Sequence, residues 1–265
     1  MSTVKTQFGK EAAEPFLEEH LHAPVSELTM IGGGELSQAF YFDTPDGPRV
    51  LRVSNQSKED FLKDQMAMRF NSDVLPVPEV FEVGDIEDGL YFAISERAEG
   101  KPLDEFSGEE VQAIMPEIIA MVDAIHALEP IGEGYGQWGL DGKGRSKTWK
   151  DELRDHSMSE DDEETRGADF YDSDLHMRLR EKIRPLVELM PEERVMIHDD
   201  VGFGNALSDG KKITAVIDWV QAGYGDPLRD VAWLDFWDEK QGFADAFKKH
   251  YEEQGKPSKD FEQRL

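Results

Sequence analysis

Short apolar runs alternate with turn residues over the first hundred positions, a pattern that is typical of antiparallel β-strands. Five of these runs are predicted as strands, at residues 28–31, 39–42, 49–53, 80–83 and 90–94. Amphipathic periodicity predicts one helix over residues 10–22 and another over residues 57–72, which Pro76 and Pro78 follow. The pattern therefore predicts an antiparallel sheet with one helix inserted between its third and fourth strands.

Beyond Gly100 the apolar spacing changes to that of helices. Ser107 and Glu110 have the spacing of a capping box, and they introduce one helical stripe that runs to Ile125. The glycine-rich stretch 132–144 is predicted as a loop. Further helices are expected at residues 148–154, 173–189, 227–237 and 241–254, with a short strand at 195–197. The prediction is an α+β fold with a sheet-bearing N-lobe at residues 1–97 and a mainly helical C-lobe at residues 98–265.

Composition excludes several classes of protein. The 265 residues contain no cysteine, which rules out disulfides, thiolate catalysis and cysteine-bound zinc. No apolar run is long enough to cross a bilayer, and the first residues lack the apolar core of a secretory signal. We therefore expect a cytoplasmic protein without a membrane partner. Since 57 acidic residues face only 29 basic ones, for a net charge of -28, we also expect no nucleic-acid partner.

The acidity has two interpretations. Acids that cover the whole surface would form the solvated shell of a halophilic protein, whereas acids in a cleft would attract a cationic substrate. Acidic residues are frequent in almost every segment, which favours the shell for most of the charge. The densest run, at residues 160–164, is expected to be a solvated loop.

Two polar positions near the end of the chain are candidate metal ligands. Short apolar runs flank a turn at residues 209–212 and predict a hairpin. With a four-residue turn, Asn205 lies opposite Val216, and Asp218 is its diagonal neighbour on the same face at about 7–8 Å. An amide oxygen and a carboxylate at that separation can share one Mg²⁺ ion.

A candidate general base lies just before this hairpin. Asp200 follows the predicted strand 195–197, and a carboxylate there can accept the proton of an attacking hydroxyl while the metal holds phosphates. His198 is assigned a supporting role through hydrogen bonds, with a role as base as the alternative, and Asp199 is expected to face solvent. The motif predicts phosphoryl transfer. A metal phosphoesterase that uses these residues without ATP is the competing interpretation.

The candidate nucleotide side lies in the first sheet. The glycines at residues 32–34, which precede Ser37, can form a loop whose N–H groups meet phosphate, or an ordinary hairpin turn. Arg52 on the following strand can reach the phosphates, and Asp64 on the next helix can hold Arg52 by a charge-assisted hydrogen bond. The alternative is a surface charge pair, but the order of glycine loop, cation and acid favours a nucleotide site.

Together these motifs resemble the aminoglycoside phosphotransferase family, which has a protein-kinase-like two-lobe fold, and within it the hygromycin B branch in particular. The likeness extends over nearly the whole chain and is strongest at residues 39–53, 75–83, 94–100 and 196–234. The resemblance implies Asp200 as base, Asn205 and Asp218 as Mg²⁺ ligands, and a nucleotide site at Gly33, Gly34, Ser37, Arg52 and Asp64. It also implies that the backbone of Ser95, Glu96, Arg97 and Ala98 binds adenine.

The resemblance further implies ATP and Mg²⁺ as cofactors and a small, hydroxylated, cationic acceptor such as an aminocyclitol. The alternatives are a kinase for an endogenous sugar or amino alcohol and an ATP-binding module without turnover. Asp226 and Asp230 look structural, the first as a helix cap and the second as a brace for the catalytic loop.

This sequence departs from the family pattern at two places. The usual glycine between the histidine and the base is Asp199, and the chain ends at Leu265 where family members continue with further helices. The second departure leads us to expect a substrate cleft with less of its wall. It also predicts an exposed apolar face, so that either a monomer or a dimer is expected.

Overall fold

The computed structural model describes residues 6–32, 37–87, 89–158 and 172–265. The chain forms two compact units. Unit 1 consists of Met1–Phe106 and Phe203–Val220, and unit 2 consists of Ser107–Gly202 and Gln221–Leu265. The segment with the candidate catalytic motif is therefore divided between the units at Gly202. The two lobes, residues 1–97 and 98–265, stay a prediction, because the two compact units divide the chain at other positions.

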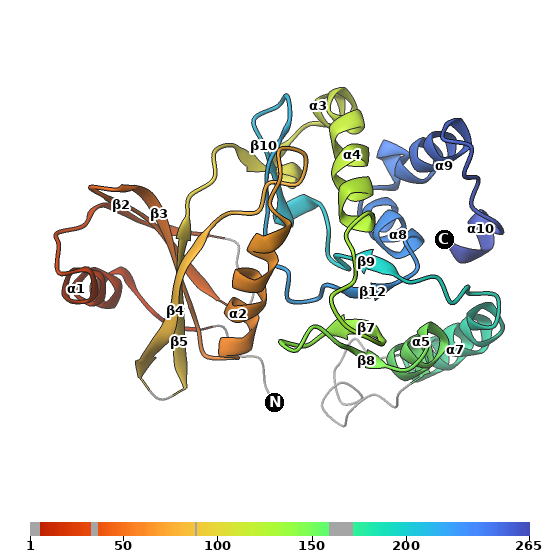
Figure 1. The fold of residues 1–265 in the computed structure, drawn as a ribbon, viewed down its shortest axis with the longest axis horizontal. Helices are drawn as coiled ribbons and strands as arrows, with labels where there is room; N and C mark the ends of the chain where they lie inside the picture. Colours follow the sequence, from red (N-terminus) through yellow and green to blue (C-terminus); the bar gives the residue numbers. More distant parts are fainter. Residues whose placement is uncertain (1–5, 33–36, 88, 159–171) are drawn as a thin grey trace. The chain divides into compact units, whose positions relative to one another are not determined.

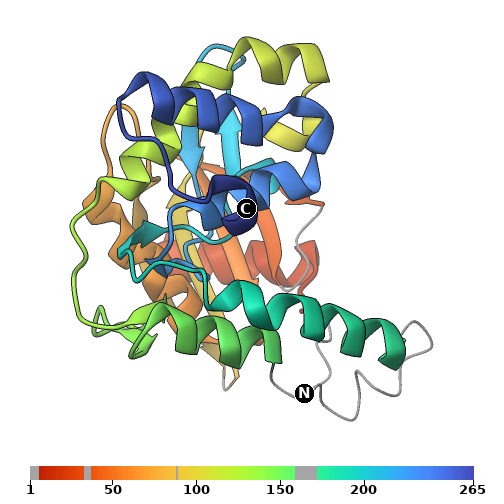
Figure 2. The same ribbon diagram turned by 90° about the vertical axis from the view of Figure 1, so that its right-hand side faces the viewer.

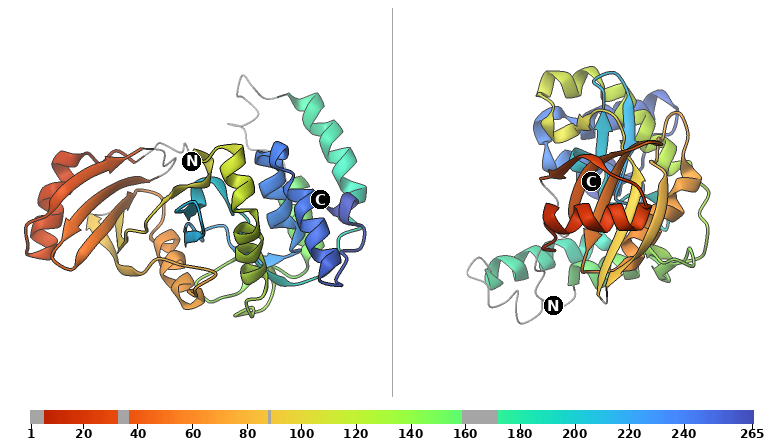
Figure 3. Two further views of the ribbon diagram at one scale, coloured as in Figure 1. Left: turned by 90° about the horizontal axis from the view of Figure 1, so that it is seen from above. Right: turned by 90° about the vertical axis from the view of Figure 1, so that its left-hand side faces the viewer.

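Unit 1 is built on a five-stranded antiparallel sheet (Figure 1). In spatial order its strands are β1 (Ser26–Ile31), β2 (Gln38–Thr44), β3 (Gly47–Ser54), β5 (Leu90–Glu96) and β4 (Val80–Glu87). Helix α1 (Lys10–Leu21) covers one face, where Leu17 packs in a core with Phe40 and Leu51 (Figure 3). Helix α2 (Lys58–Ala67) packs on the other face through Phe61. All five predicted strands and both predicted helices are confirmed, although α2 ends in a 3-10 turn, η1 (Met68–Phe70).

A smaller three-stranded sheet completes unit 1. Its strands, in order, are β11 (Ile213–Val216), β10 (Ala206–Ser208) and β6 (Lys101–Pro102), with 3-10 turns η2 (Leu103–Glu105) and η3 (Phe203–Asn205) beside them. The predicted hairpin is present, but its predicted register is wrong by one residue. Val216 pairs with Ala206 rather than Asn205, because the register shifts at Thr214. The Thr214 hydroxyl donates to the Glu99 carbonyl at 2.5 Å, which accounts for its departure from the ladder.

Unit 2 combines a four-stranded sheet with most of the helices. The strands, in order, are β8 (Gly144–Ser146), β7 (Tyr135–Trp138), β12 (Gly223–Gly225) and β9 (Val195–Ile197). The helices are α3 (Gly108–Ala113), α4 (Met115–His126), α5 (Trp149–Met158), α7 (Ser173–Val187), α8 (Leu228–Trp237), α9 (Phe243–Glu253) and α10 (Phe261–Arg264), with a 3-10 turn η4 (Glu239–Gln241). Figure 2 shows α5 and α7 side by side.

Two predictions for unit 2 are wrong. The stretch 132–144 is not a loop, since it contains β7 and reaches β8. Strand β7 lies close to β12 because β12 has a glycine there: a Cβ atom at Gly223 would lie 2.1 Å from the Gly136 carbonyl oxygen. The single helix after Ser107 is two helices that meet at Ile114, because Pro116 lacks the N–H that a continuous helix needs.

The capping box of Ser107 and Glu110 is confirmed by both of its hydrogen bonds. The acidic run at residues 160–164 lies outside the described residues. In the part of the chain that the structure describes, no helix combines the length and apolar character needed to cross a membrane.

Candidate active site

In unit 1 an ion pair joins strand β3 of the five-stranded sheet to helix α2. The guanidinium of Arg52, on β3, bonds the carboxylate of Asp64, on α2, as predicted. Only 20% of the Arg52 side chain and 7% of the Asp64 side chain are exposed, so this is a buried pair rather than a surface one. The guanidinium carbon also lies 5.1 Å from the centre of the Phe61 ring.

The second oxygen of Asp64 holds the segment that follows the hairpin. It accepts the backbone N–H of Trp219 at 2.7 Å. Trp219 is fully buried, and its indole N–H donates to the Val216 carbonyl at 3.2 Å. A single carboxylate thus fixes both the candidate phosphate-binding cation and the residue next to Asp218.

The charge of Arg52 is maintained despite its burial. Burial alone would lower the pKa of Arg52, but the carboxylates of Asp64 and Asp218 raise it above its ordinary value. Asp218 is therefore close enough to Arg52 to act on it electrostatically. The two anions balance a cation that is suited to bind phosphate oxygens.

Replacing Asp64 by Ala is expected to lower the free energy of unfolding by about 3 kcal/mol, because it leaves the buried Arg52 cation and the Trp219 N–H without this acceptor. Urea denaturation measures the change. The control is Asp85→Ala, which breaks an exposed pair with Lys58 and is expected to cost less than about 1 kcal/mol. Equal losses in the two variants would contradict the buried-pair interpretation.

The candidate metal ligands lie at the open end of one hairpin. The Ile217 N–H donates to the Asn205 carbonyl at 2.9 Å, so the two strand ends face each other there. Asp218 follows with a left-handed backbone, φ 63°, which turns the chain at that point. An amide and a carboxylate are oxygen donors that suit Mg²⁺, which keeps further positions for water and phosphate. Among the described residues, no three His, Cys, Asp or Glu side chains gather into a metal site.

The predicted nucleotide segments are only partly described. Gly33 and Gly34 lie outside the described residues, and Ser37 directly precedes β2. Ser95 and Glu96 end β5, where Ser95 is buried and the Glu96 N–H donates to the Glu79 carbonyl at 2.8 Å. The next two residues leave the strand: the Arg97 guanidinium stacks 3.9 Å over the Tyr41 ring, and Ala98 is half-buried. Their contact with adenine stays a prediction.

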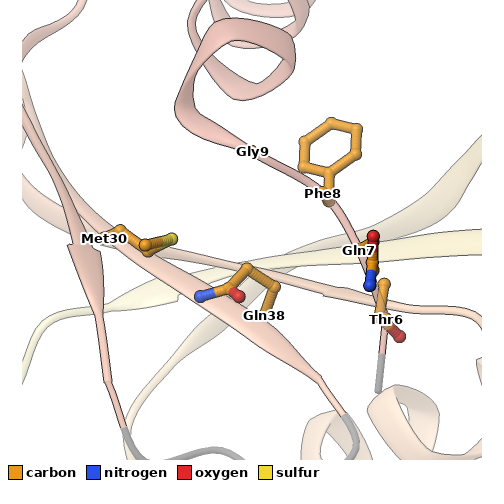
Figure 4. Close-up of a pocket in the computed structure, with 6 residues that line it drawn as sticks. All are labelled: Thr6, Gln7, Phe8, Gly9, Met30 and Gln38. Carbon is orange, nitrogen blue, oxygen red and sulfur yellow. The ribbon is translucent and has the colours of Figure 1, made fainter. Parts of the chain in front are cut away.

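Unit 1 also contains a pocket beside its N-terminal segment. It has a volume of about 520 Å³ and is lined by Thr6, Gln7, Phe8, Gly9, Met30 and Gln38 (Figure 4). The side chains of Met30, from β1, and Gln38, from β2, point toward one another. Among the residues that the structure describes, none of the predicted site residues and no charged side chain lines this pocket.

The candidate catalytic loop lies in unit 2, where one buried carboxylate holds it. Asp230, on α8, accepts the backbone N–H of His198 at 3.1 Å and that of Asp199 at 2.8 Å. The ring of His126 lies 3.0 Å from the same carboxylate. The predicted brace is therefore confirmed, and it acts on the two residues before Asp200. His198 is fully buried and Asp200 is half-buried.

Asp226 also behaves as a structural residue. Its carboxylate accepts the N–H of Leu228, the first residue of α8, at 3.0 Å. Arg264 forms a bidentate pair with the same carboxylate, at 3.0 and 2.6 Å. The prediction of Asp226 as the N-cap is wrong by one position, since Pro227 is the N-cap of α8; the carboxylate nevertheless bonds the first N–H of the helix, and an arginine holds it there.

The prediction that Asp199 faces solvent is wrong. Its carboxylate pairs with the guanidinium of Arg229, on α8, and only 26% of its side chain is exposed. Sequence reasoning did not identify Arg229. The available signal was its position directly before Asp230, the residue predicted to brace the loop. The charge of Asp199 is therefore directed at α8 rather than at water.

Left-handed backbone conformations are frequent around these residues. Of the described non-glycine residues with positive φ, three lie in the candidate motif: Asp199 at 61°, Phe203 at 39° and Asp218 at 63°. Such conformations are costly for residues with a Cβ atom and persist where surrounding contacts impose them. They are concentrated at the segments that carry the predicted base and metal ligands.

Known proteins share this sequence and this fold. Residues 27–261 match the family described as the phosphotransferase enzyme family. The chain is 34% identical to hygromycin-B 4-O-kinase from Escherichia coli over 238 residues, which cover 88% of this chain and 68% of that protein. The crystal structure of aminoglycoside phosphotransferase APH(4)-Ia matches this fold with a TM-score of 0.81, over 97% of this chain and 87% of that one. The two sequences are 30% identical.

A thermostable mutant of APH(4)-Ia, solved in a ternary complex with AMP-PNP and hygromycin B, is 33% identical, with a TM-score of 0.79 over 91% of this chain and 83% of that one. The predicted α+β class, with an antiparallel N-terminal sheet, is confirmed by these structural matches. The predicted resemblance is confirmed as well. The chain is a phosphotransferase and belongs to the phosphotransferase enzyme family.

Proposed function

We propose that this enzyme uses ATP and Mg²⁺ to phosphorylate a hydroxyl group of a small cationic aminocyclitol of the hygromycin type. The observation that carries the proposal is the carboxylate of Asp64, which holds Arg52 and the N–H of Trp219 together. A cation for phosphate and a carboxylate for a metal are thereby fixed in one cluster. A relative at 34% identity that is a hygromycin-B kinase supports the acceptor class. A cytoplasmic setting follows because ATP is supplied there.

The nucleotide is held by residues of unit 1. Arg52 binds phosphate oxygens, and its charge is secured by the carboxylates around it. Asn205 and Asp218 would hold Mg²⁺, which when bound neutralises part of the phosphate charge. Ser37 and the glycine-rich segment before it bind the phosphates through backbone N–H groups.

The acceptor hydroxyl is handled by the catalytic loop. Asp200 accepts or orients the proton of this hydroxyl as its oxygen attacks the γ-phosphorus, while the bond from that phosphorus to the bridging oxygen breaks and ADP leaves. His198 supports the loop from its buried position and does not itself take the proton. Catalysis rests mainly on the positioning of the two reactants.

An exposed aromatic group on α8 supports a ring-shaped acceptor. Phe236 and Trp237 are 76% and 58% exposed, and the Trp237 ring meets the Trp233 ring edge to face, with centres 5.7 Å apart. Aromatic faces bind cations and the apolar faces of sugar-like rings. The helix is the one whose Asp230 holds the catalytic loop.

Trp237→Ala is therefore expected to raise the KM for the acceptor about tenfold, with kcat changed much less, because a contact made equally before and during the reaction is lost. Steady-state kinetics with the acceptor varied would show the effect. Met177→Ala, on an exposed position of α7, serves as the control. A Trp237→Ala enzyme with an unaltered KM would remove the aromatic group from the acceptor site.

The proposed function is tested by ADP release from ATP and Mg²⁺ with a panel of acceptors. Hygromycin B and other aminocyclitols form one arm, neutral sugars and amino alcohols the second, and no acceptor the third. We expect turnover in the first arm that stops when Mg²⁺ is chelated. Turnover in the second arm alone would make this a metabolite kinase. Nucleotide binding without turnover in any arm would make it a binding module.

The charge composition gives a separate expectation. With a net charge of -28, mutual repulsion of surface acids opposes folding at low ionic strength. We therefore propose a halophilic enzyme, and expect its melting temperature and activity to rise from low to molar KCl, since salt screens these charges. Scanning fluorimetry in KCl, with sucrose as an uncharged stabiliser for comparison, measures this. Improvement in neither property would contradict the proposal.

A further inference from the structure

We propose that Arg229 is a positioning residue for the catalytic base: by pairing with Asp199, it fixes the backbone from which Asp200 projects. The inference rests on the proposed role of Asp200. All the residues concerned belong to unit 2.

Two consecutive residues of α8 hold two consecutive residues of the loop. Asp230 accepts the backbone N–H groups of His198 and Asp199, and Arg229 bonds the side chain of Asp199. Asp199 is therefore bound at both its backbone and its carboxylate. Asp200 follows directly, so the direction of its side chain depends on the backbone angles of Asp199.

Those backbone angles are not the ones that an aspartate prefers. Asp199 has a φ of 61°, in the left-handed region that favours glycine. A residue with a Cβ atom keeps such a conformation only where contacts impose it. Arg229 supplies the contact that a glycine at this position would not need.

Guanidinium groups on two elements act on the Asp199 carboxylate. Arg229 is itself set by α8, and its guanidinium lies 5.9 Å from the centre of the Trp233 ring. On the opposite element, β8, the pKa of Arg145 is raised, first by its hydrogen bond with Glu152 and in smaller part by Asp199. Two guanidinium groups therefore act on the Asp199 carboxylate, and one of them bonds it directly.

Close packing of the residues after Asp200 limits the conformations that the loop can adopt. Val201 is fully buried, and Gly202, at φ 98°, leaves no room for a side chain because a Cβ atom there would lie 2.4 Å from Leu234. The loop is thus pressed against α8 beyond Asp200 and bonded to it before Asp200. Loss of the Arg229 bond removes the side-chain contact of the left-handed Asp199, while Asp230 still holds its backbone N–H.

The test is a double-mutant cycle of Arg229→Gln and Asp199→Gly. Arg229→Gln is expected to lower kcat about tenfold or more, with the KM for ATP unchanged, because a misdirected base slows transfer without weakening nucleotide binding. Since glycine adopts a φ of 61° without help, the double variant is expected to match the Asp199→Gly enzyme rather than fall below it. Arg229→Lys is expected to recover part of the loss.

The control is Arg154→Gln, which breaks a partly exposed ion pair with Glu188 and is expected to leave kcat unchanged. An Arg229→Gln enzyme with normal kcat would overturn the proposal. A double variant whose losses multiply would also overturn it, since Arg229 would then act on the substrate and not through Asp199.

Failure of the proposed function would look different. If the wild-type enzyme turns over no acceptor, or if Asp200→Asn keeps full activity, the base assignment fails. Hydrogen exchange then tests the positioning role of Arg229 independently of activity. The amides of His198 and Asp199 are expected to exchange faster in Arg229→Gln and to be slowed again in the double variant. Unchanged exchange in Arg229→Gln would overturn the positioning role.

Discussion

Asp200→Asn is expected to lower kcat by about a thousandfold, the range in which a general base contributes to proton transfer. The amide that replaces the carboxylate has nearly the same shape but cannot accept the hydroxyl proton. Nucleotide affinity is expected to be preserved, because the candidate nucleotide residues Arg52 and Asp64 and the candidate metal ligand Asp218 are in unit 1, whereas Asp200 is in unit 2. ADP release with a saturating acceptor measures kcat, and binding of a fluorescent ATP analogue measures affinity.

Asp209→Asn provides the matched control for this prediction. Asp209 lies in the turn between β10 and β11, where its side chain accepts the N–H groups of Lys211 and Lys212 at 2.8 and 3.0 Å. An asparagine oxygen can accept the same bonds, so the turn is expected to persist with full activity. If both variants keep full turnover, phosphoryl transfer does not depend on a carboxylate at position 200.

Asp230→Ala is expected to have the largest effect on stability, a loss of about 3–5 kcal/mol in the free energy of unfolding. The carboxylate is fully buried and accepts the backbone N–H groups of His198 and Asp199, with His126 beside it. Its removal leaves a cavity and two backbone donors without this acceptor. Urea denaturation followed by circular dichroism gives the loss. A change below about 1 kcal/mol would show that the loop does not need this brace.

The same carboxylate makes stability depend on pH. Burial tends to raise the pKa of Asp230, but His126, His198 and the backbone N–H bonds outweigh it, so the pKa in the folded protein is lowered. A lowered pKa means that the stabilisation is present above the pKa of the unfolded chain, about 4, and is lost as the pH falls below it. Unfolding free energies measured from pH 6 to pH 3 are expected to fall less steeply for Asp230→Asn than for the wild-type chain.

Features with a local cause were predictable from the sequence. The five strands of the first sheet follow from their short apolar runs, and the helix start at Ser107 follows from its capping box with Glu110. The pair of Arg52 with Asp64 was predictable because both positions lie on regular elements that are close in the chain. The brace at Asp230 came from the family resemblance, which carries long-range information that spacing lacks.

Features that depend on distant parts of the chain were not predictable. The bulge at Thr214 arises because its hydroxyl bonds Glu99, more than a hundred residues earlier. The strand at residues 135–138 forms because Gly223 admits the backbone of Gly136 at a distance that no other residue permits. Asp199 was expected in water because its partner Arg229 lies 30 positions further along, and only the position of Arg229 beside Asp230 indicated it.

The insertion of Phe203–Val220 into unit 1 has a consequence for how the protein is made. Strand β6 pairs with β10. Asp64 accepts the N–H of Trp219, which lies 155 positions further along the chain. A ribosome must therefore synthesise most of the polypeptide before the first unit can close its small sheet. Until then the nascent unit exposes unpaired strand edge and the apolar surface that buries Trp219, so folding is slow and exposed to aggregation. Chaperones that bind nascent chains are therefore expected to raise the yield of folded enzyme, with less effect on its free energy of unfolding.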